Sequence, residues 1–508
     1  MPVDSETVRA IVEKVLDRLE RERPACKDNT PPRSGEASPL QLPESLSGAL
    51  NSPDAAVEAA SKAFAEYIRM PLETRGAIIA AMRRAALSHN ERWSREAVVE
   101  TGFGRVEDKI VKNRLAAEKT PGLEDLAAQA KSGDAGLTIE ELAPWGVIGA
   151  ITPSTNPIAT VVNNAISMLA AGNAVVFNAH PGAARVTLDC VRQLNSAIVS
   201  EGGPANVVCA LTNPTIETAQ ALMRHPGISL LVVTGGPAVV KAAFASGKKV
   251  IAAGPGNPPV VVDETADIAR AARAIVNGAS FDNNVVCIDE KEIICVEAAA
   301  EDLKAALREA GGFELSGKDW ARLAATVLAT PGGPDKEGAA NKMYVGKDAA
   351  VLLAAIEMEG AGARAHPVRP YKQAQGGKEK EGAGEPRLLF ADVEADDPFV
   401  WTEQLTPAVP LVRAASVDEA IALAKRVEGG RRHTAVMHSR NIEKLSAMAR
   451  AMDSSIFVKN GPAYAGLGDG GEGHTSFTIA SPTGEGLTSA RSFVRRRRCV
   501  LVDYFRIV

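Results

Sequence analysis

Apolar side chains follow a helical period through the first quarter of the chain. In residues 4–20 they repeat at the i, i+3, i+4, i+7 spacing of one helix face, with charged residues between them. Residues 23–43 are rich in Pro, Ser and Gly, which predicts a flexible linker. The first helix is therefore either a partner-binding helix or a terminal helix that docks on its own domain. Its uninterrupted apolar stripe favours partner binding. Residues 52–130 are expected to be mostly helical, with helices at 74–87, 92–100 and 109–130.

From Gly146 the pattern changes to short apolar runs that alternate with helices. The runs are rich in Val and Ile, and they fall at 147–151, 174–177, 207–211, 229–233 and 249–253. Buried strands that alternate with helices predict a parallel, doubly wound α/β sheet.

A second α/β pattern begins at Thr265. Its expected strands are 292–296, 343–345, 388–390 and 408–412, and its expected helices are 299–309, 349–357 and 417–427. Residues 359–385 are charged and Gly-rich, which predicts a surface excursion. Two isolated strand patterns, at 137–142 and near 500–506, are expected to pair either with each other or with another subunit.

Composition narrows the possible partners. The 508 residues carry a net charge of -5 and only 4% aromatic residues, so neither a basic surface nor a stacking platform for nucleic acid is indicated. The six cysteines lack CxxC spacing and suit a reducing cytosol. The seven histidines show no metal-ligand spacing, so no metal site is predicted. No run of 18 apolar residues occurs and the N-terminus is charged, so neither a membrane span nor a signal peptide is expected.

The stretch from Ser280 to Asp289 carries the candidate chemistry. Cys287 lies there among small and Asn-rich residues, just after the amphipathic run 268–279. A cysteine thiolate attacks an aldehyde carbon, and after loss of a hydride it is left as a thioester. The alternative is that Cys287 is a small buried hydrophobic residue, as many lone cysteines are.

Two turns at strand ends are expected to bind a ligand, because ligands of doubly wound sheets lie at the carboxyl ends of strands. These turns are Thr152–Asn156 and Thr234–Pro237, and the second opens a helix whose N–H groups can receive a diphosphate. One GxGxxG match, at Gly466, Gly468 and Gly471, lies in a loop instead of between a strand and a helix, and we interpret it as chance.

Together these motifs resemble the aldehyde dehydrogenase superfamily over roughly residues 50–508. More closely, the chain resembles the coenzyme-A-acylating branch associated with bacterial microcompartments, the propionaldehyde and acetaldehyde dehydrogenases. The segments that carry the resemblance are Pro144–Gly149, Pro153–Pro157, Met168–Ala174, Val233–Pro237, the Cys287 stretch, Glu403–Pro407 and Arg497–Asp503.

The resemblance implies roles for individual residues. Cys287 matches the nucleophile, and Asn156 matches the amide that stabilises the oxyanion together with the Cys287 N–H. Glu403 matches the carboxylate that holds the nicotinamide ribose. Further cofactor contacts are expected at Thr152, Pro153, Ser154, Thr155, Thr234, Gly235, Gly236, Pro237 and Leu405. The cofactors implied are NAD and coenzyme A as co-substrate.

Three positions are informative because they depart from the hydrolytic members or leave alternatives open. Hydrolytic relatives carry a Glu about 34 residues before the cysteine, and here that position is Ala253, so water lacks a general base. His180 lies near the position of a Lys that contacts the adenine ribose; it either contacts a ribose or diphosphate, or caps a turn. His433 is either a base for an incoming thiol or, with more support, a loop histidine that bonds backbone.

The expected function is oxidation of a short-chain aldehyde with NAD⁺ and coenzyme A to acyl-CoA and NADH. The alternatives are a hydrolytic NAD-dependent aldehyde dehydrogenase and a non-catalytic microcompartment scaffold. The expected organisation is an encapsulation-type helix (1–20), a linker (21–45), an NAD-binding domain (46–263, with an oligomerisation strand at about 136–143), a catalytic domain (264–460) and a return segment with a C-terminal oligomerisation strand (461–508). Expected partners are the aldehyde, coenzyme A, a shell protein through residues 1–20, and further copies in a homodimer or homotetramer, in the lumen of a cytoplasmic microcompartment.

Overall fold

The computed structural model of the chain describes residues 42–356 and 386–507. The expected helix at 4–20, the linker up to residue 41 and the expected excursion at 359–385 lie outside the described residues. Within the described ranges, no helix combines the length and the apolarity needed to cross a lipid bilayer.

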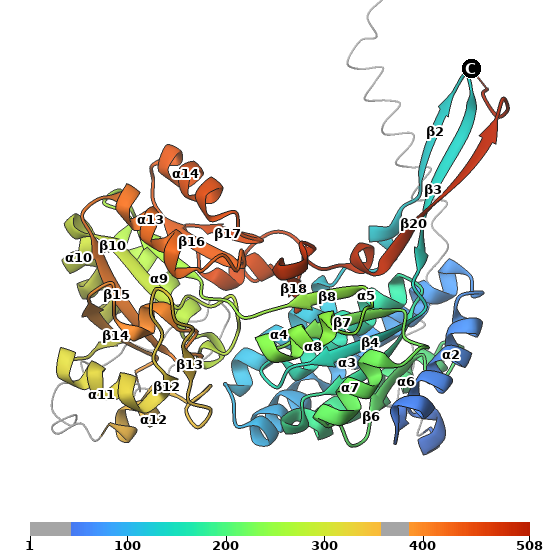
Figure 1. Ribbon diagram of the computed structural model, residues 1–508, viewed down its shortest axis with the longest axis horizontal. Helices are drawn as coiled ribbons and strands as arrows, with labels where there is room; N and C mark the ends of the chain where they lie inside the picture. Colours follow the sequence, from blue (N-terminus) through green and yellow to red (C-terminus); the bar gives the residue numbers. More distant parts are fainter. Residues whose placement is uncertain (1–41, 357–385, 508) are drawn as a thin grey trace, which may run out of the picture. The chain divides into compact units, whose positions relative to one another are not determined.

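The first sheet has six parallel strands in the order β1-β6-β5-β4-β7-β8 (Figure 1). Its strands are β1 (Ala49–Leu50), β4 (Val147–Thr152), β5 (Ala174–Ala179), β6 (Val208–Leu211), β7 (Leu230–Thr234) and β8 (Val250–Ala253). Every residue of β4, β5, β6 and β8 is buried, as expected for a sheet covered on both faces. The predicted doubly wound parallel sheet is confirmed. Its order reverses at β4, so the ends of β4 and β7 are neighbours.

Two layers of helices cover this sheet. Contacts group α3 to α6 on one face and α2, α7 and α8 on the other. The helices are α2 (Pro53–Tyr67), α3 (Leu72–Thr101), α4 (Val106–Lys119), α5 (Pro157–Ala170), α6 (Ala184–Ser200), α7 (Ile216–Arg224) and α8 (Pro237–Phe244).

Two of the helix limits predicted in this region are wrong. The segments 74–87 and 92–100 form the single helix α3. It continues through Asn90 because the Asn90 amide, instead of breaking the helix, donates to the Ile110 carbonyl at 2.8 Å. The predicted helix 109–130 ends at Lys119, because Pro121 and Gly122 follow and the chain then enters a strand at Gln129.

The second sheet has seven parallel strands in the order β11-β14-β15-β10-β9-β16-β17. They are β9 (Pro259–Val262), β10 (Glu292–Val296), β11 (Gly312–Glu314), β14 (Leu388–Val393), β15 (Ala408–Ala414), β16 (Thr434–His438) and β17 (Ile456–Lys459). The helices are α9 (Ile268–Ala279), α10 (Glu297–Glu309), α11 (Gly317–Val327), α12 (Ala349–Ala355), α13 (Val417–Val427) and α14 (Ile442–Met452). Contacts pair α9 with α10 and α13 with α14.

The predicted strand at 343–345 is wrong, because this segment forms turns. Asn341 starts them: its carbonyl accepts from the Tyr344 N–H at 2.9 Å and its side chain from the Met343 N–H at 3.2 Å. A short antiparallel pair, β12 (Leu328–Thr330) and β13 (Ala339–Ala340), precedes the turns.

The two isolated strand patterns pair with each other. β3 (Gly136–Pro144) lies between β2 (Gln129–Gly133) and β20 (Val494–Val502) in an antiparallel three-stranded sheet, which we call the arm (Figure 1). Its register runs from Val494 opposite Pro144 to Val502 opposite Gly136. The other short strands are β18 (Ile479–Ala480) and β19 (Gly486–Leu487).

Short 3-10 helices complete the described chain. They are η1 (Glu44–Leu46), η2 (Leu123–Leu126), η3 (Pro181–Ala183), η4 (Phe281–Asn284), η5 (Pro398–Trp401), η6 (Ala463–Leu467), η7 (Ser481–Thr483) and η8 (Ala490–Phe493). The domain limits expected from the sequence stay predictions.

Candidate active site

Cys287 follows a turn with an unusual backbone. Three consecutive residues, Asp282, Asn283 and Asn284, have φ values of 45°, 56° and 65°. Asp and Asn enter this left-handed region more readily than other residues with a side chain. Side-chain bonds hold the turn: the Asn284 amide donates to the Ala279 and Glu290 carbonyls at 2.8 and 2.9 Å, and the Asn283 amide donates to the Gly346 carbonyl at 3.0 Å. The Asn-rich composition therefore has a structural cause.

The buried Asp282 carboxylate ties this turn to the first helical layer. Its Oδ1 accepts from the Arg105 backbone N–H at 2.7 Å. Its Oδ2 accepts from Lys109 Nζ at 2.9 Å and from Lys112 Nζ. Gly104 makes this approach possible, because a Cβ at its position would lie 1.9 Å from Asp282 Oδ1.

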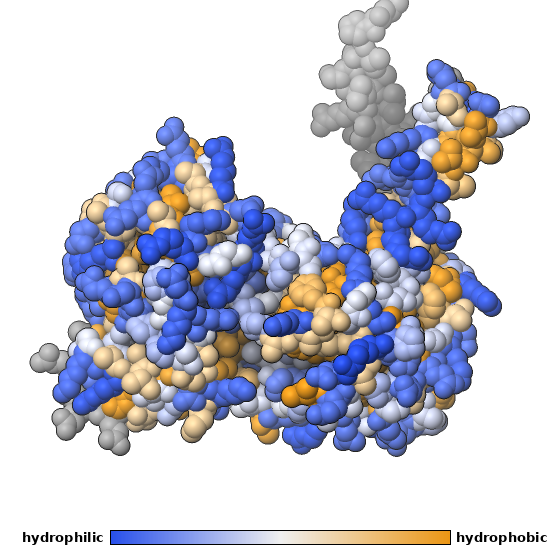
Figure 2. All heavy atoms as spheres, viewed as in Figure 1, coloured by the Kyte–Doolittle hydropathy of each residue, from blue (hydrophilic) through white to orange (hydrophobic). Residues whose placement is uncertain are grey.

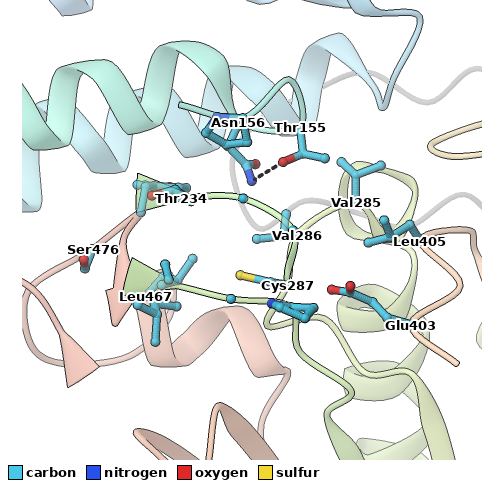
Figure 3. Close-up of a pocket in the computed structure, with 18 residues that line it drawn as sticks. Thr155, Asn156, Thr234, Val285, Val286, Cys287, Glu403, Leu405, Leu467 and Ser476 are labelled. Carbon is cyan, nitrogen blue, oxygen red and sulfur yellow. Dashed lines mark hydrogen bonds between the residues drawn. The ribbon is translucent and has the colours of Figure 1, made fainter. Parts of the chain in front are cut away.

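Asn156 begins α5 but does not cap it through its side chain. Instead, Asn156 Oδ1 accepts from Lys112 Nζ at 2.5 Å, and Asn156 Nδ2 donates to Thr155 Oγ1 at 3.2 Å. Figure 3 shows the Asn156 amide and the Cys287 sulfur facing the same space. An Asn at a helix start normally bonds its own helix, so this arrangement indicates another use of the amide.

Most of the site residues expected from the sequence line one pocket. It contains Cys287, Asn156 and Glu403 (Figure 3). Its lining also includes Ala253, the last residue of β8. The other expected residues in its lining are Pro153, Thr155, Thr234, Gly235, Gly236 and Leu405. The strand ends of the first sheet and the cysteine turn before the second sheet therefore meet at this point.

A second cavity continues from the first, and the two share Pro153, Thr155, Thr234, Gly235, Gly236 and Leu405. It adds Thr152, Ser154 and His180 from the expected set. Pro237 is the first residue of α8 and lines neither cavity.

This second cavity fits a dinucleotide. The N-terminus of α8 opens onto it at Gly236, where backbone N–H groups favour a diphosphate. Thr152 Oγ1 is buried without a hydrogen-bond partner among the described residues, so a ligand hydroxyl there would satisfy it.

His180 caps a turn, which is one of the two roles expected for it, and it also lines the second cavity. Its Nδ1 accepts from the Gly182 N–H at 3.1 Å, so it caps η3. Desolvation, together with the nearby Lys342 ammonium, lowers the pKa of His180. The ring is therefore neutral at physiological pH, and it can exchange only hydrogen bonds with a ligand.

The resting cysteine is a thiol. Burial raises the pKa of Cys287 to about 12; the Glu403 carboxylate adds to this shift and the Lys291 ammonium opposes it. Burial also raises the pKa of Glu403, whose Oε1 accepts from the Gly256 N–H at 3.1 Å. Reaction therefore requires the Cys287 proton to leave, and Glu403 is the carboxylate that shares the pocket with it.

His433 lines neither cavity. It is buried; its backbone N–H donates to Glu428 Oε1 at 2.9 Å, and its Nδ1 lies 2.9 Å from Thr434 Oγ1. Burial lowers the pKa of His433 to about 3, so the ring is neutral. These contacts favour the loop-histidine interpretation.

Several lining or supporting residues were not expected from the sequence. Leu467, Ser476, Phe477 and Ile479 line the first pocket from the C-terminal segment. Lys109 and Lys112 were assigned only to a helix, although their i, i+3 spacing places both on one face of it. The loop with the GxGxxG match packs on Lys119, which donates to the Gly468 carbonyl at 2.5 Å.

Comparison with known proteins finds relatives over most of the chain. A model of the aldehyde dehydrogenase family matches residues 47–312. The chain is 52% identical over 431 residues to the acetaldehyde dehydrogenase (acetylating) EutE of Escherichia coli K12, a match that covers 85% of this chain and 87% of that protein.

Solved structures give the same result. The structure of Rhodopseudomonas palustris propionaldehyde dehydrogenase with bound CoA and an acylated cysteine is 47% identical, with a TM-score of 0.82, and the match covers 90% of this chain and 98% of that one. A propionaldehyde dehydrogenase from the Clostridium phytofermentans fucose utilisation bacterial microcompartment is 42% identical, with a TM-score of 0.83 and coverage of 91% and 100%.

The raised pKa of Cys287 generates a first prediction. In the ligand-free protein, the rate of Cys287 alkylation by iodoacetamide should keep rising about tenfold per pH unit up to pH 10, because only the thiolate reacts. Glu403→Gln removes a negative charge, so it should lower the pKa of the thiol and speed alkylation at pH 8. Mass spectrometry of the Cys287 peptide measures both, with the exposed Cys499 as an internal reference for the reagent. A rate that levels off near pH 9 would contradict the prediction.

Proposed function

Since this chain belongs to the aldehyde dehydrogenase family, we propose that it is a CoA-acylating aldehyde dehydrogenase of short-chain aldehydes. The reaction is aldehyde + NAD⁺ + CoA giving acyl-CoA + NADH + H⁺. The observation that carries the proposal is the pocket in which Cys287, Asn156 and Glu403 meet beside Ala253. Acetaldehyde and propionaldehyde are the proposed substrates, because the relatives are named for them.

Each of these residues has a step to perform. The Cys287 sulfur bonds to the carbonyl carbon of the aldehyde, and the Glu403 carboxylate takes the proton of the thiol. Asn156 Nδ2 and the Cys287 backbone N–H donate to the oxygen that becomes negative, a contribution of about 3–4 kcal/mol for one such donor. NAD⁺ would supply the hydride acceptor when bound, which leaves an acyl thioester on Cys287. The CoA sulfur then bonds to the acyl carbon, the Cys287 sulfur leaves, and the proton of the CoA thiol returns to Cys287.

Ala253 separates this function from hydrolysis. Its buried methyl group lies in the pocket lining, where a hydrolytic enzyme needs a carboxylate that activates water. The thioester on Cys287 is therefore kept for a thiol, which is a better nucleophile toward it than unassisted water. The scaffold alternative is disfavoured because a protein without catalysis has no need for this convergence of polar groups on one cysteine.

The proposed cofactors are NAD and coenzyme A. Thr152, His180 and the α8 N-terminus are proposed to hold the dinucleotide in the second cavity, and Glu403 the nicotinamide ribose. The two cavities are continuous, so a dinucleotide bound in the second one reaches the cysteine through their shared lining.

Residues 1–20 are proposed to bind a shell protein and so place the enzyme in a microcompartment lumen. The support is the amphipathic pattern of this segment and the microcompartment origin of a relative that is 42% identical. An apolar helix face requires a partner surface, and a helix-in-groove contact with a shell protein supplies one.

The arm is proposed to join copies of the chain into a homodimer or homotetramer. Figure 2 shows hydrophobic side chains gathered on the arm. The exposed apolar residues of the arm are Ile139, Val500, Leu501 and Val502, and Tyr504, Phe505 and Ile507 follow in the segment after it. β20 is also an edge strand, and such an edge with apolar side chains calls for a partner.

The function is tested by following NADH with and without CoA. With propionaldehyde, NAD⁺ and CoA the enzyme should turn over continuously, and without CoA it should stop after about one NADH per site because the thioester persists. Cys287→Ser should lower turnover on the order of 10⁴-fold or more. Cys295→Ala, which changes a buried cysteine of β10 outside the pocket, is the matched control. Continued formation of free acid without CoA would show hydrolysis, and no NADH at all would show a scaffold.

Shell binding is tested by deletion of residues 1–20. The shortened protein should keep its turnover and should no longer sediment with purified shells. A fluorescent protein that carries residues 1–20 should sediment with the same shells. If the shortened enzyme still sediments with the shells, or the fusion does not, the proposed role of this segment is wrong.

Assembly is tested by light scattering. The unchanged chain should have the mass of a dimer or a tetramer. The double substitution Val500→Asp and Val502→Asp places charges on exposed arm residues and should shift the mass toward a monomer without loss of helix content. A wild-type protein that is already monomeric would contradict the proposal.

A further inference from the structure

A buried cluster that bonds to the Asn156 side chain contains two lysines and one carboxylate. None of these three side chains lines either cavity. Lys109 and Lys112 of α4 and Asp282 of the cysteine turn are each at most 2% exposed. We propose that Lys112 is a positioning residue that orients the Asn156 amide, so that Nδ2 and not Oδ1 faces the reacting oxygen. The inference rests on the proposed function, because it assigns Lys112 to the oxyanion step.

The chemistry of the two groups sets the orientation. An asparagine amide has a donor end and an acceptor end, and the two ends have almost the same shape. A lysine ammonium is a donor only, so the atom 2.5 Å from Lys112 Nζ has to be Asn156 Oδ1. If the amide flipped, two donors would face each other in a buried place. Lys112 therefore directs the Nδ2 end toward the pocket.

Thr155, the other neighbour of the Asn156 amide, does not select one orientation of it. Thr155 Oγ1, which accepts from Asn156 Nδ2 at 3.2 Å, is a hydroxyl and can also donate. It therefore suits either orientation. In the described part of the chain, Lys112 is the one partner of the Asn156 side chain that accepts a single orientation.

Asp282 fixes the position of Lys112 relative to the nucleophile. One carboxylate oxygen, Asp282 Oδ2, accepts hydrogen bonds from both Lys109 Nζ and Lys112 Nζ. Asp282 lies five residues before Cys287 in the sequence. A chain of charge-assisted bonds therefore runs from the cysteine turn through Lys112 to Asn156. One network therefore holds Asn156 and Cys287, although Asn156 follows β4 of the first sheet and Cys287 precedes β10 of the second.

The network also strengthens the donor. An ammonium bonded to the amide oxygen draws electron density from the amide, and linked hydrogen bonds reinforce one another. The hydrogens on Asn156 Nδ2 therefore carry more positive charge, and they bind an alkoxide-like oxygen better than a neutral carbonyl. This predicts a larger effect of Lys112 on the chemical step than on aldehyde binding.

The test is a double-mutant cycle on the full-length enzyme with propionaldehyde, NAD⁺ and CoA. Asn156→Ala should lower kcat by about 10²–10³-fold. Lys112→Met should lower kcat by about 10–10²-fold, with KM for the aldehyde changed by less than about threefold. In the Asn156→Ala background, Lys112→Met should cost less than about twofold more, because no amide is left to orient. Equal losses in the two backgrounds would overturn the proposal.

Three further variants keep the test decisive. Lys109→Met removes the other ammonium from the same carboxylate, together with its 3.3 Å bond to the Thr155 carbonyl, and leaves the Lys112–Asn156 bond. Its loss in kcat should therefore be about tenfold smaller. Lys112→Arg keeps a donor-only side chain and should retain more kcat than Lys112→Gln, whose amide carries both a donor and an acceptor. If Lys112→Met does not fold, the Arg and Gln pair carries the test. Equal kcat for Arg and Gln would overturn the proposal.

A readout without turnover separates this inference from the proposed function. Alkylation of Cys287 by iodoacetamide needs the thiolate but no oxyanion donor, so Lys112→Gln should change its rate less than about threefold. A loss of alkylation equal to the loss of kcat would show a damaged nucleophile turn and would overturn the positioning role. If the wild-type enzyme forms no NADH with CoA present, the proposed function fails instead.

Discussion

The structure depends on the reversal of strand order at β4. Because β4 pairs with β5 on one side and β7 on the other, the carboxyl ends of β4 and β7 are neighbours. Asn156 lies in the loop after β4 and Thr234 ends β7, so one constraint of topology places both beside the cysteine turn. The remaining parts of the site, from Ala253 to Glu403, are arranged around that point.

Parts of this arrangement can be predicted from sequence because their causes are local. Buried parallel strands leave continuous runs of Val and Ile, and β4 to β8 fall within a few residues of the expected runs. The two-residue strand β1 leaves no such run and was not expected. The turn at Thr234–Gly236 and the cysteine in its Asn-rich stretch are also local signals. The specific roles of Asn156 and Glu403 came only through resemblance, because a place at a strand end predicts a ligand nearby but not what Asn156 does to it.

Other parts have causes that lie far along the chain. Lys112 has the pattern of a solvated helix residue, and only its contact with Asp282, 170 positions later, makes it a buried cation. At Lys112, tertiary context therefore overrides local propensity. Two other errors have local causes. Asn341 turns the chain before a strand forms at 343–345. Pro121 and Gly122 end the predicted helix 109–130 early, and the hairpin of β2 with β3 takes up Gln129.

The register of the arm has a consequence for biosynthesis. Val494 of β20 lies opposite Pro144 of β3, so the second strand that pairs with β3 is made about 350 residues after it. β4 begins three residues after Pro144 and is made long before β20. Phe477 and Ile479, which line the pocket, are made about 190 residues after Cys287. Contacts of this separation form slowly, and during synthesis they are impossible until the later segment has been made. A nascent chain therefore carries Cys287 without a finished pocket around it until these residues have been added.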